Sequence, residues 1–92
     1  MIYLYIKFVN YYTYKYMNID MTKDELLKKF GLNVKIARMK KGLTQEQLAE
    51  LMNIHLTYIA KIETGKINMS LGKILELSKV LNVNINNLLF IE

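Results

Sequence analysis

From Thr22 onward, apolar residues recur every three or four positions, which is the spacing of amphipathic helices. Residues that start or stop helices divide this stretch into five segments. The expected starts follow Thr22, Thr44, His55, Ser70 and Asn84. Glycine or asparagine, which can take the left-handed conformation that ends a helix, stands at each expected stop. These stops are Gly42, Asn53, Gly65 and Asn82. The pattern predicts a compact all-α domain of five helices in residues 21–92.

Local details sharpen this prediction. Thr22 with Glu25, and Thr44 with Gln47, have the spacing of a capping box. Gly31 lies inside the first predicted helix and costs it about 1 kcal/mol relative to alanine. In the fourth helix the expected inward face is Leu71, Ile74, Leu75, Ser78 and Leu81. Three methionines are expected to fill the core or its rim, namely Met39, Met52 and Met69.

The first twenty residues follow another pattern. Apolar and polar or aromatic positions alternate from Ile2 to Phe8, and this period of two is typical of a strand. The segment holds seven of the ten aromatic residues: Tyr3, Tyr5, Phe8, Tyr11, Tyr12, Tyr14 and Tyr16. Three interpretations stay open: a start placed upstream of the real one at Met17 or Met21, a disordered tail, or a strand that pairs with its twin in a dimer. Its pattern fits neither a signal peptide nor a membrane span.

Composition narrows the chemistry. The chain has no cysteine and a single histidine, His55, so we expect no metal, no cofactor and no disulfide. It offers no cluster of histidine and carboxylates, no nucleophile motif and no glycine loop for phosphate, which argues against an enzyme. The net charge of +5 favours an anionic partner, either nucleic acid or an anionic membrane. We expect a protein of the reducing cytoplasm.

The second and third predicted helices form a pair over residues 44–64. Their inner residues are Leu48, Ala49, Ile54, Ile59 and Ile62. Ala49 is expected where the two helices approach most closely, because a larger side chain there would push them apart. The outer face of the third helix carries few acidic groups. Such a helix can enter the major groove of DNA, about 12 Å wide, without repulsion from phosphates.

The residues from Phe30 to Phe90 resemble the phage-repressor and Cro helix-turn-helix family, also called the xenobiotic-response-element family. The matching residues of the first half are Gly42, Leu43, Thr44, Gln45, Glu46, Gln47, Leu48 and Ala49. Those of the second half are Ile59, Ile62, Glu63, Gly65, Ser70, Leu71, Ile74, Leu81, Val83, Leu88 and Leu89. The resemblance implies a lambda-repressor-like fold that binds double-stranded DNA and regulates transcription.

The same resemblance implies roles for individual residues. Gln45 would bind a phosphate and brace the recognition helix, residues 56–64, with Thr44 near the same backbone. Base edges would face Leu56, Thr57, Ala60 and Lys61, whereas Lys66 and Asn68 would flank phosphates. Arg38 would pair with Glu63 across the core. Tyr58 is a further candidate for a phosphate contact, with packing at the turn as the alternative.

Four positions depart from the family pattern. His55 stands where serine or threonine is usual, Asn53 replaces a glycine, Met69 replaces a proline, and Leu56 is apolar where a polar reader is common. Leu56 can contact a thymine methyl but cannot read a guanine. We interpret His55 as an imperfect helix cap rather than as a ligand.

The fifth helix is the expected site of homodimerisation. Ile85, Leu88, Leu89 and Phe90, followed by Ile91, crowd a short element that cannot bury them all alone. Within the family, the chain looks similar to the controller proteins of restriction-modification systems, and a phage or plasmid repressor stays open. Two alternatives give the aromatic segment a function: an antitoxin that holds its toxin there, and an adaptor that lies in a membrane interface.

Overall fold

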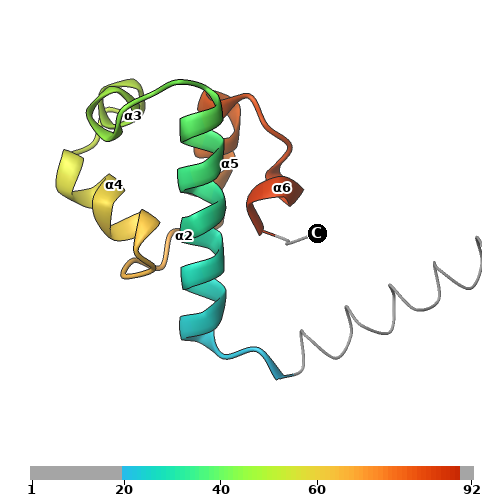
Figure 1. Cartoon of the computed structure of the whole chain (residues 1–92). Helices are drawn as coiled ribbons and strands as arrows, with labels where there is room; N and C mark the ends of the chain where they lie inside the picture. Colours follow the sequence, from blue (N-terminus) through green and yellow to red (C-terminus); the bar gives the residue numbers. More distant parts are fainter. Residues whose placement is uncertain (1–19, 90–92) are drawn as a thin grey trace, which may run out of the picture.

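The computed structural model describes residues 20–89, and these form a helical domain with the expected five helices in the expected order (Figure 1). The helices are α2 (Lys23–Lys40), α3 (Gln45–Met52), α4 (Leu56–Glu63), α5 (Leu71–Leu81) and α6 (Ile85–Leu89). The predicted strand of the first segment, and the dimer contacts of Phe90 and Ile91, lie outside the described residues.

The helix ends follow the local signals in the sequence. Thr22 Oγ1 accepts a hydrogen bond from the Glu25 backbone N–H at 3.1 Å, but only this half of the first predicted capping box is formed within residues 20–89. Thr44 and Gln47 form the complete box, with contacts of 3.0 and 2.8 Å. The expected stops are confirmed, since φ is positive at all four: Gly42, Asn53, Gly65 and Asn82.

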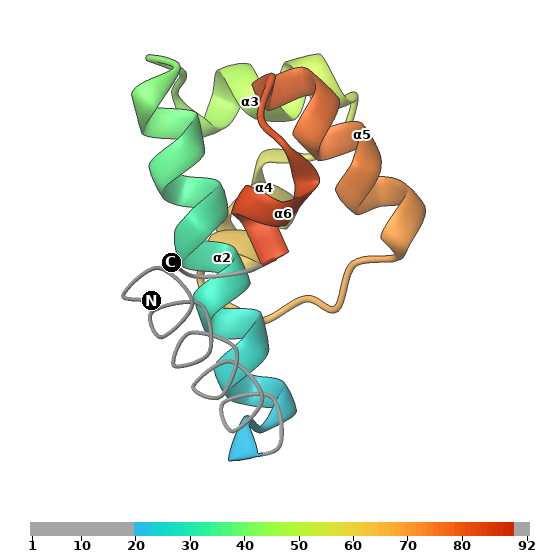
Figure 2. The same ribbon diagram turned by 90° about the vertical axis from the view of Figure 1, so that its right-hand side faces the viewer.

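The long helix α2 runs the height of the domain, beside the four shorter helices (Figures 1 and 2). It packs against α4 and α6, while α3 packs against α4 and α5, and α5 against α6. In Figure 1, α3 and α4 lie on one side of α2 and α6 on the other. Every helix contributes to the set of fully buried side chains: Val34, Leu48, Ile59, Ile62, Leu77 and Leu88.

Gly31 lies where α2 closely approaches the backbone of α4, although glycine lowers the local stability of a helix. A Cβ atom built on Gly31 would lie 2.3 Å from the backbone oxygen of Ile62 and 2.8 Å from that of Glu63. Contacts this short are incompatible with a side chain, so α2 and α4 can approach this closely only because residue 31 is glycine. The glycine weakens α2 locally and allows its packing against α4.

Three expectations about burial are wrong. On α5 the inward residues are Ile74, Leu77, Ser78 and Leu81, whereas Leu71 and Leu75 are exposed, because the buried stripe follows positions i, i+3, i+4 and i+7 from Ile74. Met52 and Met69 are buried as expected, but Met39 is exposed. Leu88, assigned to a dimer contact, is fully buried in the core of its own chain.

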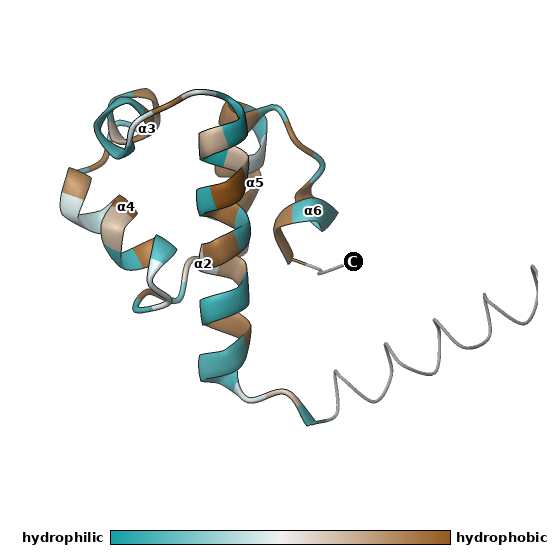
Figure 3. Ribbon diagram, in the orientation of Figure 1, coloured by the Kyte–Doolittle hydropathy of each residue, from teal (hydrophilic) through white to brown (hydrophobic). Residues whose placement is uncertain are grey.

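Apolar and hydrophilic positions alternate around each helix, as the hydropathy colouring of Figure 3 shows. None of the helices between residues 20 and 89 has both the length and the apolar character needed to cross a membrane.

Candidate nucleic-acid interface

The α3–α4 pair forms a helix-turn-helix. The turn runs through Asn53 in the left-handed conformation, and the Ile54 N–H donates to the Ala49 carbonyl at 3.0 Å. Ala49 is buried in the core and lines the hollow between α3 and the start of α4. Ile59 and Ile62 fill the inner side of α4, each with at most 1% exposed surface. The inner side is therefore fully committed to the core, and only the outer side is free to meet a ligand.

His55 caps α4, which confirms the interpretation of this residue as a cap. Its Nδ1 accepts a hydrogen bond from the Thr57 backbone N–H at 3.1 Å. An imidazole nitrogen thus does what a serine or threonine oxygen does at this position in other helices. In this contact Nδ1 is the acceptor and the backbone N–H is the donor.

A buried polar network fixes the end of α4 against α2 and α3. Arg38 Nε donates to Glu63 Oε2 at 2.6 Å and Nη2 donates to Oε1 at 3.2 Å, which makes a two-pronged ion pair. Arg38 Nη1 also donates to the Leu43 carbonyl at 2.7 Å, in the loop before α3. Gln45 Nε2 donates to Glu63 Oε1 at 3.0 Å. The expected Arg38–Glu63 pair is therefore present, and Gln45 bonds the same carboxylate.

The start of α3 keeps hydrogen-bond donors that the network does not use. The side-chain amide nitrogen of glutamine carries two hydrogens, so Gln45 Nε2 can donate to Glu63 and to a second acceptor. Within the described residues, the backbone N–H groups of Gln45 and Glu46 have no acceptor, whereas those of Thr44 and Gln47 are bound in the capping box. Donors at the positive end of a helix suit an anion such as a phosphate.

The structure separates the predicted contact residues into three groups. Leu56, Thr57 and Lys61 are exposed along the outer face of α4, with Ala60 half-buried among them. Lys66 and Asn68 are exposed in the segment that follows α4, and Thr44 is exposed at the start of α3. Tyr58 is half-buried and packs against the core, which favours the packing alternative for this residue. Glu63 is the single carboxylate of α4, and it is buried and paired.

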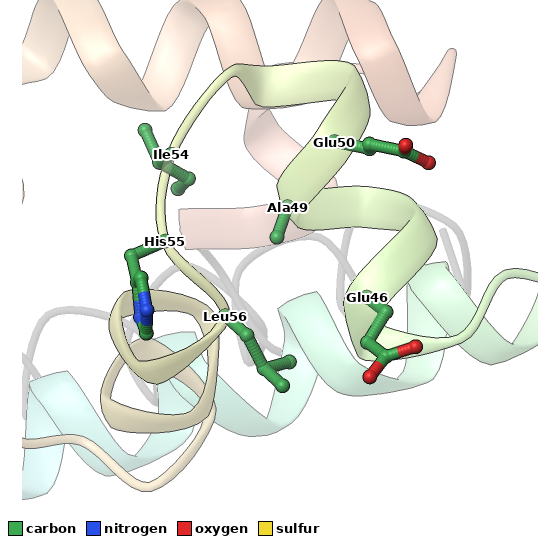
Figure 4. A pocket seen from close by; sticks show the side chains of 6 residues that line it. All are labelled: Glu46, Ala49, Glu50, Ile54, His55 and Leu56. Atoms are coloured by element: carbon green, nitrogen blue, oxygen red, sulfur yellow. The ribbon is translucent and has the colours of Figure 1, made fainter.

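A shallow hollow of about 420 Å³ between α3 and α4 was missed at the sequence level. Figure 4 shows Glu46 and Glu50 projecting from α3, and His55 and Leu56 at the start of α4; Ala49 and Ile54 complete the lining. Two glutamates one turn apart repel phosphates, so they limit the side from which DNA can approach. Their i, i+4 spacing in the sequence is the signal that would have indicated a shared face. Within residues 20–89 no group of acidic or histidine side chains could hold a metal ion.

Comparisons with known proteins point to one family. A family model described as helix-turn-helix matches residues 34–88. The control protein C.SmaI of Serratia marcescens is 40% identical over 57 residues, which cover 62% of this chain and 68% of that protein. The control protein C.BamHI of Bacillus amyloliquefaciens is 43% identical over 61 residues, or 65% of this chain and 75% of that protein.

Two solved structures are similar in both sequence and fold. The restriction-modification controller protein C.AhdI from Aeromonas hydrophila superposes with a TM-score of 0.64 at 39% identity, covering 67% of this chain and 94% of that one. The restriction-modification controller protein C.Esp1396I superposes with a TM-score of 0.60 at 37% identity, covering 64% and 77%. The expected family and the helical arrangement are therefore confirmed.

Proposed function

The chain belongs to the helix-turn-helix family, and on that premise we propose that it regulates transcription by binding double-stranded DNA as a homodimer. Helix α4, with the residues up to Thr64, is the recognition helix and lies in the major groove. Residues 21–92 are the DNA-binding domain, and residues 1–20 are an extension of it. The matched relatives are control proteins and a transcriptional regulator, which supports a regulatory function. In this proposal the chain acts in the cytoplasm and is not an enzyme.

One observation carries the proposal: α4 is fixed on its inner side and free of carboxylates on its outer side. Ile59, Ile62 and the Glu63 pair hold its orientation, while Thr57 and Lys61 are exposed. A helix must be held rigidly for its side chains to meet base edges in register. The same helix must also carry no unpaired negative charge toward phosphates. In α4 both conditions are met.

The contacts divide into readers and anchors. Leu56, Thr57, Ala60 and Lys61 are the readers; Leu56 offers an apolar contact to a thymine methyl, and Lys61 can donate to guanine acceptors. Thr44, Gln45, Lys66 and Asn68 are the anchors, which contact phosphates and carry no direct sequence information. Gln45 links the two groups, because its amide also bonds Glu63 at the end of α4.

The homodimer is proposed to form through the outer side of α6. Ile85 and Leu89 are half-buried and leave apolar surface exposed, whereas Leu88 is fully used by the core. Phe90 would extend this surface. Two copies related by a two-fold axis would place their α4 helices in successive major grooves, so the operator would contain two half-sites about 34–36 Å apart.

The similarity to control proteins of restriction-modification systems leads to a finer proposal, that this chain controls the genes of such a system, including its own promoter. Footprinting on the DNA upstream of its own gene tests it. The result expected is a protected site with two half-sites, and a duplex with one half-site scrambled should bind at least about tenfold more weakly, since each mismatched base pair costs about 1–3 kcal/mol. Equal binding to the site and to random DNA would contradict sequence-specific regulation.

A further inference from the structure

Helix α2 has a second apolar face that no described element covers. Leu32, Ile36 and Met39 are 52%, 41% and 59% exposed. Their spacing of i, i+4 and i+7 places them on one side of the helix, whereas Phe30, Val34 and Arg38 face the core. Figure 3 shows apolar positions interleaved with hydrophilic ones along the length of α2. We call Leu32, Ile36 and Met39 the outer stripe of α2.

The outer stripe needs an explanation that isolated exposed residues do not. Single apolar residues on a surface are normal, but contiguous ones usually mark a contact. Here three large side chains follow one another on a helix whose opposite side already supplies the core. The stripe also belongs to α2, whereas the readers of the proposed DNA interface lie on α4. DNA contact therefore gives no reason for it.

We propose that residues 1–19 of the same chain pack on the outer stripe of α2. Only Asp20, Met21 and Thr22 separate this segment from the first residue of α2, so its last residue is close in sequence to the helix that it would cover. Along α2, the stripe lies roughly 13 to 24 Å from Lys23, at 1.5 Å per residue. To reach the stripe, the segment has to fold back along α2. Nineteen residues can span about 60 Å when extended, which is enough to reach the whole stripe.

The composition of the segment fits the surface beside it. It carries seven aromatic residues and four aliphatic ones, Ile2, Leu4, Ile6 and Val9, before Met17. Its aliphatic residues stand at alternate positions from Ile2 to Ile6, and these are the residues that we expect to contact the stripe. Lysines border the stripe at helical spacing, and the ammonium groups of Lys28 and Lys35 can lie on the faces of tyrosine rings. The segment and the stripe each leave apolar surface that the other can bury.

Thiol modification of the full-length protein tests this packing, because the natural chain has no cysteine. Ile36→Cys places one probe on the stripe, and Leu75→Cys is its matched control on α5, since the two native residues are 41% and 45% exposed. The rate of reaction with N-ethylmaleimide is divided by the rate for the same variant in denaturant. We expect this ratio to be at least about tenfold lower for Ile36→Cys than for Leu75→Cys, because the reagent reaches a covered thiol only through local opening. Met39→Cys is a second probe if Ile36→Cys does not fold.

Three further results identify the occupant. Ile6→Ser with Phe8→Ser, added to Ile36→Cys, should restore the rate, whereas Phe90→Ser should not. The protection should not change on dilution, because the contact lies within one chain. Equal ratios for Ile36→Cys and Leu75→Cys would overturn the proposal. So would protection that disappears on dilution, which would assign the stripe to a second copy, or protection released by Phe90→Ser alone. None of these results depends on DNA binding.

Discussion

The two sides of α2 are held by different kinds of contact. On the side of the helix-turn-helix, the buried Ile59 and Ile62 are accompanied by directional bonds at the end of α4: the Arg38–Glu63 ion pair and the Gln45–Glu63 hydrogen bond. On the side of α6, one hydrogen bond from Asn33 Nδ2 to the Leu88 carbonyl, 3.0 Å long, accompanies apolar packing. Apolar contacts supply stability without fixing an angle, whereas hydrogen bonds and ion pairs fix orientation. The helix that must align with DNA has the directional contacts.

Arg38→Ala should have the largest effect on the helix-turn-helix side. It leaves the Glu63 carboxylate buried without its partner, which costs about 3–5 kcal/mol of the free energy of unfolding. Denaturant unfolding measures this cost. The matched control is Lys73→Ala, which removes an exposed ion pair with Glu76 and should change stability by less than about 1 kcal/mol. Equal effects of the two substitutions would show that the Arg38 network does not hold α4.

Leu88→Ala examines the opposite side. Leu88 is fully buried, so its truncation should cost about 2–5 kcal/mol in the unfolding free energy of the protomer. Leu89→Ser should instead weaken dimerisation while changing protomer stability much less, because Leu89 is only half-buried. Sedimentation at several concentrations, together with unfolding, separates the two. A dimer that is lost with Leu88→Ala at full protomer stability would return Leu88 to the interface.

Gly31→Ala should destabilise the contact between α2 and α4 by about 1–3 kcal/mol, because the added methyl group meets the backbone oxygens of Ile62 and Glu63. The control is Gly72→Ala in α5, where a Cβ meets nothing within 4 Å. That substitution should stabilise the protein by up to about 1 kcal/mol through helix propensity. Thermal unfolding of both variants gives the comparison, and a stabilising Gly31→Ala would refute the close approach.

His55→Ala should have the smallest effect on stability, about 1 kcal/mol, because it removes one cap contact at an exposed position. His55→Asn should retain most of the stability, since an asparagine oxygen can accept the same Thr57 N–H. Unfolding midpoints of the two variants test whether the imidazole acts as a cap. Unchanged unfolding midpoints in both variants would mean that the cap contributes nothing to α4.

Most of the fold followed from local signals in the sequence. The caps at Thr44 and Ser70 and the left-handed stops at Asn53 and Asn82 involve residues within a few positions of one another, so the sequence was sufficient to predict them. The prediction of the inward face of α5 was wrong because Leu71, Leu75 and Leu77 are the same residue type. Only the packing partners of α5 decide which of these leucines is buried.

The candidate site was predicted in part for a related reason. The Arg38–Glu63 pair joins residues 25 positions apart, and it was expected through the family resemblance rather than from spacing. Gln45 was expected to brace the recognition helix, but its bond to Glu63, 18 positions away, was not predicted. The carbonyl of Leu43 as a third partner of Arg38 has no signal in the sequence pattern. The hollow beside His55 was indicated only by the i, i+4 spacing of Glu46 and Glu50. Gly31 is the reverse case, since its local cost is outweighed by a distant contact.

The central claim is that the outer face of α4 reads bases while its surroundings hold phosphates. Two exposed lysines test this claim most directly, Lys61 as a proposed base reader and Lys66 as a proposed phosphate anchor. The two variants are Lys61→Ala and Lys66→Ala. Each variant is titrated with the operator duplex and a random duplex at several salt concentrations. Lys61→Ala, like Thr57→Ala to a smaller extent, should reduce the preference for the operator by roughly 1–3 kcal/mol. Lys66→Ala should weaken binding to both duplexes equally. It should also lower the slope of log affinity against log salt concentration by about one. If Lys61→Ala and Thr57→Ala weaken both duplexes equally, α4 does not read the sequence.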